Sequence, residues 1–266
     1  MTARKMLPRL VLCAVVFIVL LASIPLMTLA FGSISTSRDW RTASHRPSGL
    51  APDPAVEQGA VVQVYSARTF GWRGAFAVHT WLAAKEPGAD LYTRYEVIGW
   101  YSRMGHSAVS VTNTRTPDTE WFSAAPQLIR DLRGADAQAV IDKLPAAVAS
   151  YPHPDLYRAW PGPNSNTFVA TALRAVPELH VALPPTAIGK DFRADLSVFG
   201  MTPSETGLEL EIFGLLGLKA GWVEGIELNM LTLVAGIDIR RPALKLPGIG
   251  RIGVDAVASA RATGAR

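Results

Sequence analysis

The longest apolar run of the chain extends from Leu10 to Phe31 and contains no charged residue. Basic residues stand before it at Arg4, Lys5 and Arg9. At about 1.5 Å per residue, roughly 20 helical residues cross a hydrocarbon core about 30 Å thick. The pattern therefore predicts that residues 1–31 form a transmembrane helix, which attaches the chain to a membrane through residues 10–31.

A cleaved signal peptide is the alternative interpretation of this run, because Thr28-Leu29-Ala30 provides a small-residue cleavage site. The run is longer than the apolar core of about 7 to 15 residues that is usual in signal peptides, which favours an uncleaved signal anchor. The short basic N-terminus favours a cytoplasmic start. We therefore expect a single-pass protein of the inner (cytoplasmic) membrane whose soluble domain is periplasmic or otherwise extracytoplasmic.

Residues 32–58 are rich in Ser, Arg, Pro and Thr and contain few large apolar residues, which predicts a linker. From residue 59 onward, runs of β-branched and aromatic residues predict strands. Turn-forming residues at 85–90 join two of these strands as a hairpin. The predicted strands cover residues 61–65, 75–83, 93–100 and 107–111.

The middle of the chain predicts helices. Residues 126–132 and 135–149 have helix-forming composition, and Pro145 interrupts the second segment. A rigid loop at residues 161–163 then precedes apolar residues at helical spacing, which predict a helix from Ser165 to Val176.

Apolar and polar residues alternate in the C-terminal third, at 208–212 and again at 225–231. Several charged residues in this region disfavour a second transmembrane span. The alternation predicts strands and hairpins that complete a sheet or small barrel. An alternative is that the apolar, glycine-rich face of this region rests on the bilayer. Residues 256–266 predict a flexible tail, so we expect one exported α+β domain over residues 59–255.

Composition removes several classes of function. The net charge of +4 becomes +1 without the three basic residues before the apolar run, because 23 Lys and Arg then face 22 Asp and Glu. This balance provides no basic surface for nucleic acid. The single cysteine, Cys13, lies in the apolar run, so the domain has no thiol nucleophile. The scattered histidines show no metal-ligand spacing, so we expect no metal and no other cofactor. They are His45, His79, His106, His153 and His180.

Asn164, Ser165 and Asn166 stand where the rigid loop becomes a helix. Such a junction offers free backbone N–H groups and the positive end of the helix dipole, which suit a nucleophile or an anion. Ser and Asn are equally common there as N-caps. His79 lies in a predicted apolar strand, where burial keeps an imidazole neutral, as a general base requires. A structural histidine bonded to a neighbour is the alternative.

A histidine strand, His79-Thr80-Trp81, followed by a helix that opens Asn164-Ser165-Asn166-Thr167-Phe168, resembles the circularly permuted papain-like folds. These include NlpC-type and lecithin-retinol-acyltransferase-like proteins, in which cysteine stands at the position of Ser165. The resemblance implies a papain-like antiparallel β-sheet or barrel packed on helices, with Ser165 as the nucleophile and His79 as its base. A serine in place of cysteine depends more on that base and on an oxyanion hole.

Glu96, on the returning strand of the hairpin, is the candidate for the group that orients His79, unless it faces solvent. The candidate substrate-binding residues that go with this site are Asn164, Asn166, Arg73, Trp81 and Trp160.

Four stretches also resemble a bacterial membrane-anchored family of unknown function, from Val61 to about Val254: R-G-A-F-A-V-H-T-W, R-Y-E-V-I-G-W, G-P-N-S-N-T-F and R-R-P-A-L-K-L-P-G. This second resemblance implies no activity. Two functions therefore stay open. One is a Ser/His hydrolase or acyltransferase acting on an amide or ester of an envelope lipid or a peptidoglycan-type substrate. The other is a non-catalytic envelope protein for binding or assembly.

Overall fold

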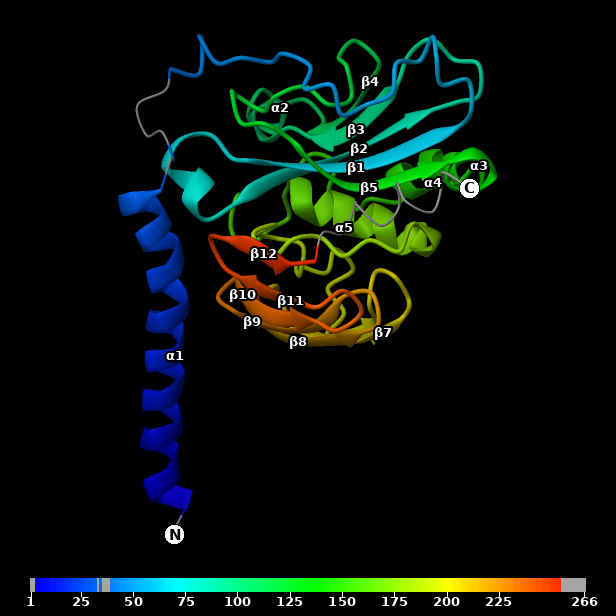
Figure 1. Cartoon of the computed structure of the whole chain (residues 1–266). Coiled ribbons are helices and arrows are strands. Elements are labelled where there is room, and N and C mark those ends of the chain that lie inside the picture. The colour runs from blue at the N-terminus through cyan, green and yellow to red at the C-terminus, as the bar shows by residue number, and fades with distance from the viewer. Residues whose placement is uncertain (1–2, 33, 35–38, 255–266) are drawn as a thin grey trace.

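The computed structural model describes residues 3–32, 34 and 39–254, so the predicted tail at 256–266 lies outside the described residues. A long helix, α1 (Ala3–Phe31), stands beside a domain in which two antiparallel sheets enclose a layer of helices and loops (Figure 1). The prediction of an α+β protein with an N-terminal apolar helix is confirmed.

The first sheet has the strand order β4-β3-β2-β1-β5, and every neighbouring pair is antiparallel. The predicted hairpin forms between β2 and β3, where Leu82 lies opposite Tyr95. The strands are β1 (Val61–Arg68), β2 (Val78–Lys85), β3 (Thr93–Val97), β4 (Val109–Thr112) and β5 (Gln127–Arg133).

Strand β5 corrects the prediction of a helix at residues 126–132. Gln127–Arg133 pairs with β1, with Leu128 opposite Tyr65. The composition favours a helix, but β1 would otherwise present a row of unpaired backbone N–H and C=O groups at the edge of the sheet. Pairing with β1 outweighs the weak helical preference of seven residues.

Helix α5 (Ser165–Ala175) packs against β2 and β3 and forms the middle layer of the domain. Its residues Phe168, Val169 and Leu173 are buried with Val64 and Leu82 of the sheet. The predicted break near Pro145 divides the preceding segment into two helices. The remaining helical elements are η1 (Gly71–Ala75), α2 (Gly99–Arg103), α3 (Gly134–Ile141), α4 (Leu144–Ala149) and η2 (Pro177–Leu179).

Part of the predicted linker covers the outer face of the five-stranded sheet, which is the face away from α5. Pro47 forms a β-bridge with Thr119. The Leu50 N–H donates a 2.7 Å hydrogen bond to the Asp118 carboxylate. Leu50 also packs on the aromatic cluster that includes Trp81 and Trp121. Residues 39–58, within the predicted linker, therefore form an irregular cover on this face of the sheet.

The second sheet is a seven-stranded meander in which each strand pairs with the next. It follows the predicted alternation but forms a separate sheet instead of completing the first one. Its strands are β6 (Phe199–Met201), β7 (Gly207–Ile212), β8 (Leu216–Gly221), β9 (Gly225–Met230), β10 (Leu233–Asp238), β11 (Ala243–Leu246) and β12 (Gly250–Gly253).

The seven-stranded sheet is inverted relative to the usual amphipathic sheet. Its charged side chains face inward, toward α5, and Glu209, Lys219 and Glu227 are each at most 3% exposed. The alternating apolar side chains face outward, where Leu210 is 44% exposed and Leu218 is 54% exposed. These two residues lie opposite each other on neighbouring strands, so they belong to one face.

Helix α1 is docked on the domain. It contacts η1 and β10, and Leu21 in its middle is only 5% exposed. Pro25, one turn further on, packs against Gly248, where an added Cβ would lie 2.6 Å from the Pro25 Cα. Among the described residues, α1 has the length and apolar composition of a membrane anchor or a signal sequence over Val11–Phe31.

Candidate functional site

The predicted junction between the rigid loop and α5 forms as a capping box. The Asn164 side-chain oxygen accepts hydrogen bonds from the backbone N–H groups of Asn166 (2.9 Å) and Thr167 (3.2 Å). The Thr167 hydroxyl accepts in turn from the Asn164 N–H at 3.2 Å. Two of the free N–H groups in the first turn of the helix, those of Asn166 and Thr167, are therefore already satisfied within the chain.

The same motif ties three segments together. Thr80 on β2 donates from its hydroxyl to the Asn166 side-chain oxygen at 2.9 Å. The Asn166 amide nitrogen donates to the carbonyls of Val78 (3.0 Å) and Ile188 (2.7 Å). Gly189 lies against the cap: it has a φ of +96°, and an added Cβ would lie 2.3 Å from the Asn164 amide nitrogen. The two asparagines predicted to bind substrate thus act as structural bridges, and both are 3% exposed.

Ser165, the predicted nucleophile, occupies the first turn of α5 and is 4% exposed. Its hydroxyl makes no hydrogen bond within the part of the chain that the structure describes. The residue is therefore positioned by its backbone alone, without a neighbouring base.

His79, the predicted base, lies on the opposite face of the same sheet. Side chains alternate along a strand, and on β2 Val78, Thr80 and Leu82 point toward α5. His79 and Trp81 point the other way, into the cluster under residues 39–58. The sheet therefore lies between the His79 imidazole and Ser165.

The structure does bring His79 and Glu96 together, as the hairpin predicts. The His79 Nε2 lies 2.9 Å from a Glu96 carboxylate oxygen. Arg94, two residues before Glu96 on the same strand, donates to that oxygen at 2.9 Å. All three side chains are buried, so the solvent-facing alternative for Glu96 is wrong. Cross-strand neighbours on one face of a sheet account for this contact.

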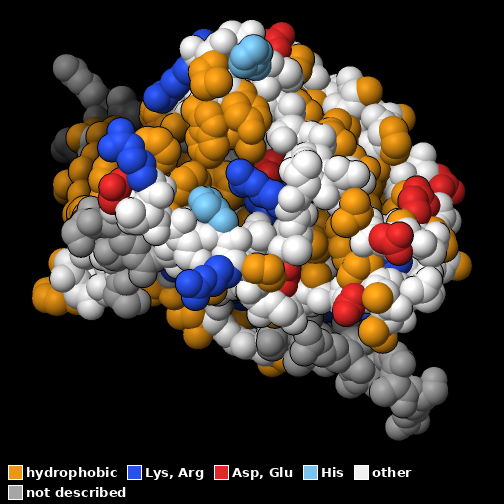
Figure 2. All heavy atoms as spheres, turned by 90° about the horizontal axis from the view of Figure 1, so that it is seen from above, with side chains coloured by type: hydrophobic (Ala, Val, Ile, Leu, Met, Phe, Trp, Pro, Cys, Tyr) orange, Lys and Arg blue, Asp and Glu red, His pale blue; other side chains and the backbone are white. Residues whose placement is uncertain are grey.

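Aromatic rings enclose this buried trio. The His79 ring stacks on Trp121 with a centroid distance of 3.8 Å and lies 5.7 Å from Trp81. The Arg94 guanidinium lies 4.1 Å from the Trp81 ring centroid, at cation–π distance. Figure 2 looks onto this side of the molecule, where side chains of both charges lie among apolar ones.

Burial and charge set the protonation of the trio in opposite senses. Burial lowers the pKa of His79, against the pull of Glu96 toward the charged form. Burial alone would raise the pKa of Glu96, but the hydrogen bond from His79 and the charge of Arg94 outweigh it and lower the pKa to about 2. A neutral imidazole therefore sits beside an ionised carboxylate that is neutralised by arginine.

The remaining predicted substrate-binding residues are dispersed. Trp81 is fully buried, and its indole N–H donates to the Pro117 carbonyl at 2.7 Å. Arg73 is exposed in η1. Trp160 is 53% exposed and donates to the Thr232 hydroxyl at 2.9 Å. Within the described residues, no group of His, Cys, Asp and Glu is arranged to hold a metal ion.

A family model for proteins of unknown function, DUF3750, matches residues 59–192. The chain belongs to the DUF3750 family. No curated protein and no solved structure matches the chain. The DUF3750 segment includes His79, Glu96 and Ser165 and ends just after Lys190 and Asp191. The papain-like resemblance receives no support from these comparisons.

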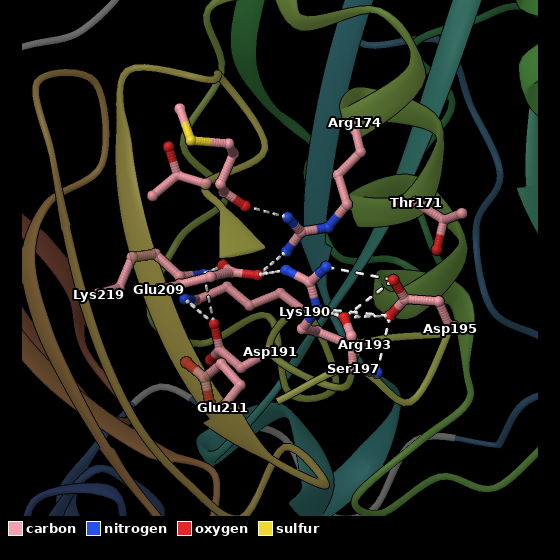
Figure 3. A network of polar contacts seen from close by, with 12 residues as sticks. Thr171, Arg174, Lys190, Asp191, Arg193, Asp195, Ser197, Glu209, Glu211 and Lys219 are labelled. Atoms are coloured by element: carbon pink, nitrogen blue, oxygen red, sulfur yellow. Dashed lines mark hydrogen bonds and ion pairs between the residues drawn. The ribbon is translucent and has the colours of Figure 1, made fainter. Parts of the chain in front are cut away.

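A network of buried charges joins the DUF3750 segment to the seven-stranded sheet (Figure 3). The Lys219 ammonium lies 2.9 Å from Asp191 and 3.2 Å from Glu209. Glu209 also pairs with Arg174 of α5 and with Arg193, and Figure 3 shows its carboxylate between their two guanidinium groups.

A second part of this network surrounds Glu227. Lys190 and Lys245 each pair with the Glu227 carboxylate at 2.6 Å. Burial alone would raise the pKa of Glu227, but Lys190 and Lys245 outweigh it and lower the pKa. The alternation of the C-terminal strands contained the signal for this network, because Glu209, Lys219 and Glu227 all occur at inward positions.

Glu211 is the exception within the network. It accepts a 3.3 Å hydrogen bond from Asn229 and is 2% exposed. Burial, followed by the negative charge of Asp191, raises the pKa of Glu211 to about 8. Glu211 is therefore a buried carboxyl group that holds its proton near neutral pH.

Proposed function

We propose that this DUF3750 protein is a non-catalytic, membrane-anchored protein of the cell envelope that serves in binding or assembly. One observation carries the proposal: the sheet separates Ser165 from His79. The capping box adds to it, because the Asn164 side chain already accepts from the N–H groups of Asn166 and Thr167, two of the α5 amides that could hold an oxyanion. Serine without a base in reach is a poor nucleophile.

The proposed anchor is α1, retained in the mature protein with the domain on the extracytoplasmic side. Val11–Phe31 is long enough to span a bilayer. Its contact with the domain supports retention over cleavage, because Leu21 is buried and Pro25 fits against Gly248. Removal of this segment on export would expose the part of the domain that contacts α1.

A Ser/His hydrolase or acyltransferase on a papain-like fold is the second candidate. Two observations favour it: the predicted His79–Glu96 pair is formed at 2.9 Å, and the Ser165 hydroxyl makes no hydrogen bond within the described residues. Catalysis on an envelope lipid or peptidoglycan-type substrate would require the two faces of the sheet to be connected by a rearrangement of β2.

A serine-reactive fluorophosphonate probe separates the two candidates. The full chain in lipid nanodiscs would be treated as wild type, Ser165→Ala and His79→Ala, with heat-unfolded protein as the background. We expect all three folded samples to show equal labelling at background level. Strong labelling of wild type that disappears in both variants would establish the hydrolase and overturn the proposal.

Retention of the anchor is tested by the mass of the chain extracted from membranes. We expect a product that includes residues 1–31 and that stays with the membrane in alkaline carbonate. A product that begins after Ala30 would contradict the anchor.

A further inference from the structure

The outward face of the seven-stranded sheet is apolar in every strand. Cross-strand partners continue the same face from one strand to the next, as Met201 with Leu208 and Leu218 with Leu228. The outward side chains are Phe199, Met201, Leu208, Leu210, Ile212, Leu216, Leu218, Ala220, Ile226, Leu228, Met230, Leu233, Ala235, Ile237, Leu244, Leu246 and Ile252. We call this surface the apolar sheet face.

Exposure to water does not explain the apolar sheet face. In a sheet with one wet side, polar residues face the water and apolar residues face the core. Here the charged side chains of the strands face inward and form the buried ion network, whereas Leu218 (54%), Ile226 (42%) and Leu244 (53%) on the opposite face are exposed. A continuous apolar surface of this extent marks contact with a partner or a membrane.

The position of α1 identifies the environment. Gly248, in the turn between β11 and β12, packs on Pro25 of α1. Pro25 precedes the end of the span at Phe31 by six residues, or about 9 Å along the helix axis. If α1 crosses a bilayer, this turn therefore lies below the level where the span ends, within the depth of about 5 to 10 Å that interfacial apolar faces occupy.

The orientation of the sheet agrees with this depth. In Figure 1 the seven-stranded sheet forms the side of the domain nearest to the N-terminal half of α1, and that half continues beyond the sheet. The charged inner face is turned toward α5, so the apolar sheet face looks along α1 toward its N-terminus.

We infer that the apolar sheet face lies in the interfacial layer of the leaflet in which α1 ends, in contact with lipid. This inference rests on the proposed anchoring by α1. The exposed apolar surface of α1, including Leu26 (53%) and Met27 (61%), stands next to the domain. The same bilayer therefore covers the apolar sheet face and the exposed apolar side of α1. In this arrangement α1 crosses the membrane, while the seven-stranded sheet enters one leaflet only.

Spin labels in the full chain test this inference. In a Cys13→Ser background, Leu218→Cys would place one label on the apolar sheet face. Val111→Cys is the matched control, because Val111 is also a strand residue with an apolar side chain of similar exposure (53%) but lies on β4 of the other sheet. The chain would be reconstituted in nanodiscs. The relaxation of each spin label caused by collisions with lipid-soluble oxygen would be compared with that caused by collisions with a water-soluble nickel chelate.

We expect the label at 218 to collide at least several-fold more with oxygen than with the chelate, and the label at 111 to show the reverse. Equal access of the chelate to both labels would overturn the inference, because the apolar sheet face would then stand in water. Shielding of the label at 218 from both reagents would also overturn it in favour of a protein partner. Failure of the chain to enter nanodiscs would instead count against the anchor.

The fluorescence of a native tryptophan provides a second measurement that does not depend on a spin label. Trp222, in the turn between β8 and β9, is 60% exposed. The difference in fluorescence between wild type and Trp222→Phe isolates its emission from that of the other tryptophans. We expect brominated lipids to quench this difference and aqueous iodide to leave it unchanged. The opposite pattern would contradict contact with lipid.

Discussion

Apolar and polar side chains alternate along the strands of the seven-stranded sheet as the rule for a two-faced sheet requires, but the two sheets turn opposite kinds of side chain toward α5. In the five-stranded sheet, Val78 and Leu82 turn their apolar side chains toward α5. In the seven-stranded sheet, Glu209 and Lys219 turn charged side chains toward the same layer, and their apolar neighbours face outward. Alternation therefore reveals that a strand has two different faces, but the medium on each side decides which face is buried.

The largest effect expected from this comparison is the loss of a buried charge on the inner face. Lys219→Met would leave Asp191 with Lys190 as its remaining basic partner and weaken the neutralisation of Glu209, so the buried network would carry an excess of negative charge. We expect a loss of about 3 to 5 kcal/mol in the free energy of unfolding. The measurement is urea unfolding of the full chain in detergent, followed by circular dichroism.

Arg133→Met is the control for that experiment. Arg133 pairs with Glu57 and Asp131 on the surface of the five-stranded sheet and is 39% exposed at its side chain. We expect a loss below about 1 kcal/mol. Similar losses for both variants would mean that the inner network is no more buried than an ordinary surface pair.

A pair of leucines compares the apolar faces directly. Leu82→Ala removes a fully buried side chain from the core on α5 and is expected to cost about 2 to 5 kcal/mol. Leu218→Ala on the apolar sheet face should cost less than about 1 kcal/mol in detergent, because the side chain is 54% exposed to its surroundings. The same urea titration measures both, and equal costs would contradict the inverted arrangement.

The last comparison concerns pH, and its expected effect is smaller than those of Lys219→Met and Leu82→Ala. Glu211 has a pKa of about 8 in the folded chain against 4.5 for an ordinary glutamate. Between these values the folded chain holds one proton more than the unfolded chain, so stability falls as pH rises. We expect a loss of roughly 2 kcal/mol between pH 6 and pH 8 from this group.

Glu211→Gln should remove that part of the pH dependence while keeping the acceptor for Asn229. The measurement is the difference in unfolding free energy at pH 6 and pH 8 for wild type and variant. Parallel curves for the two proteins would show that Glu211 is ionised in the folded state at neutral pH.

Local signals predicted much of the first sheet and its helix. The Asn164 cap, the helix that begins at Ser165 and the proximity of His79 to Glu96 all follow from residues close in sequence or joined by a short hairpin. These features depend on capping and turn chemistry, which the sequence contains in full.

Three features depended on distant parts of the chain. Residues 127–133 became a strand because β1 had an open edge. The side on which His79 points depends on a shift of one residue, which no pattern of apolar residues in β2 could fix since both faces of that strand are buried. The charged side chains of the C-terminal strands face inward because their partners Arg174, Lys190 and Arg193 lie there. Their direction also depends on the medium in contact with the apolar sheet face.

Arg68 connects the helix, the turn and both sheets. At the end of β1, its guanidinium donates to the carbonyls of Gly74 (2.9 Å), Gly248 (2.6 Å) and Ile249 (3.0 Å). Gly248 in turn touches Pro25 of α1. A spanning helix tilts to match the thickness of its bilayer. Because these hydrogen bonds join the end of β1 to the turn that contacts α1, a change in the tilt of α1 would tilt the whole domain. Membrane thickness would then set the angle between the five-stranded sheet and the membrane surface.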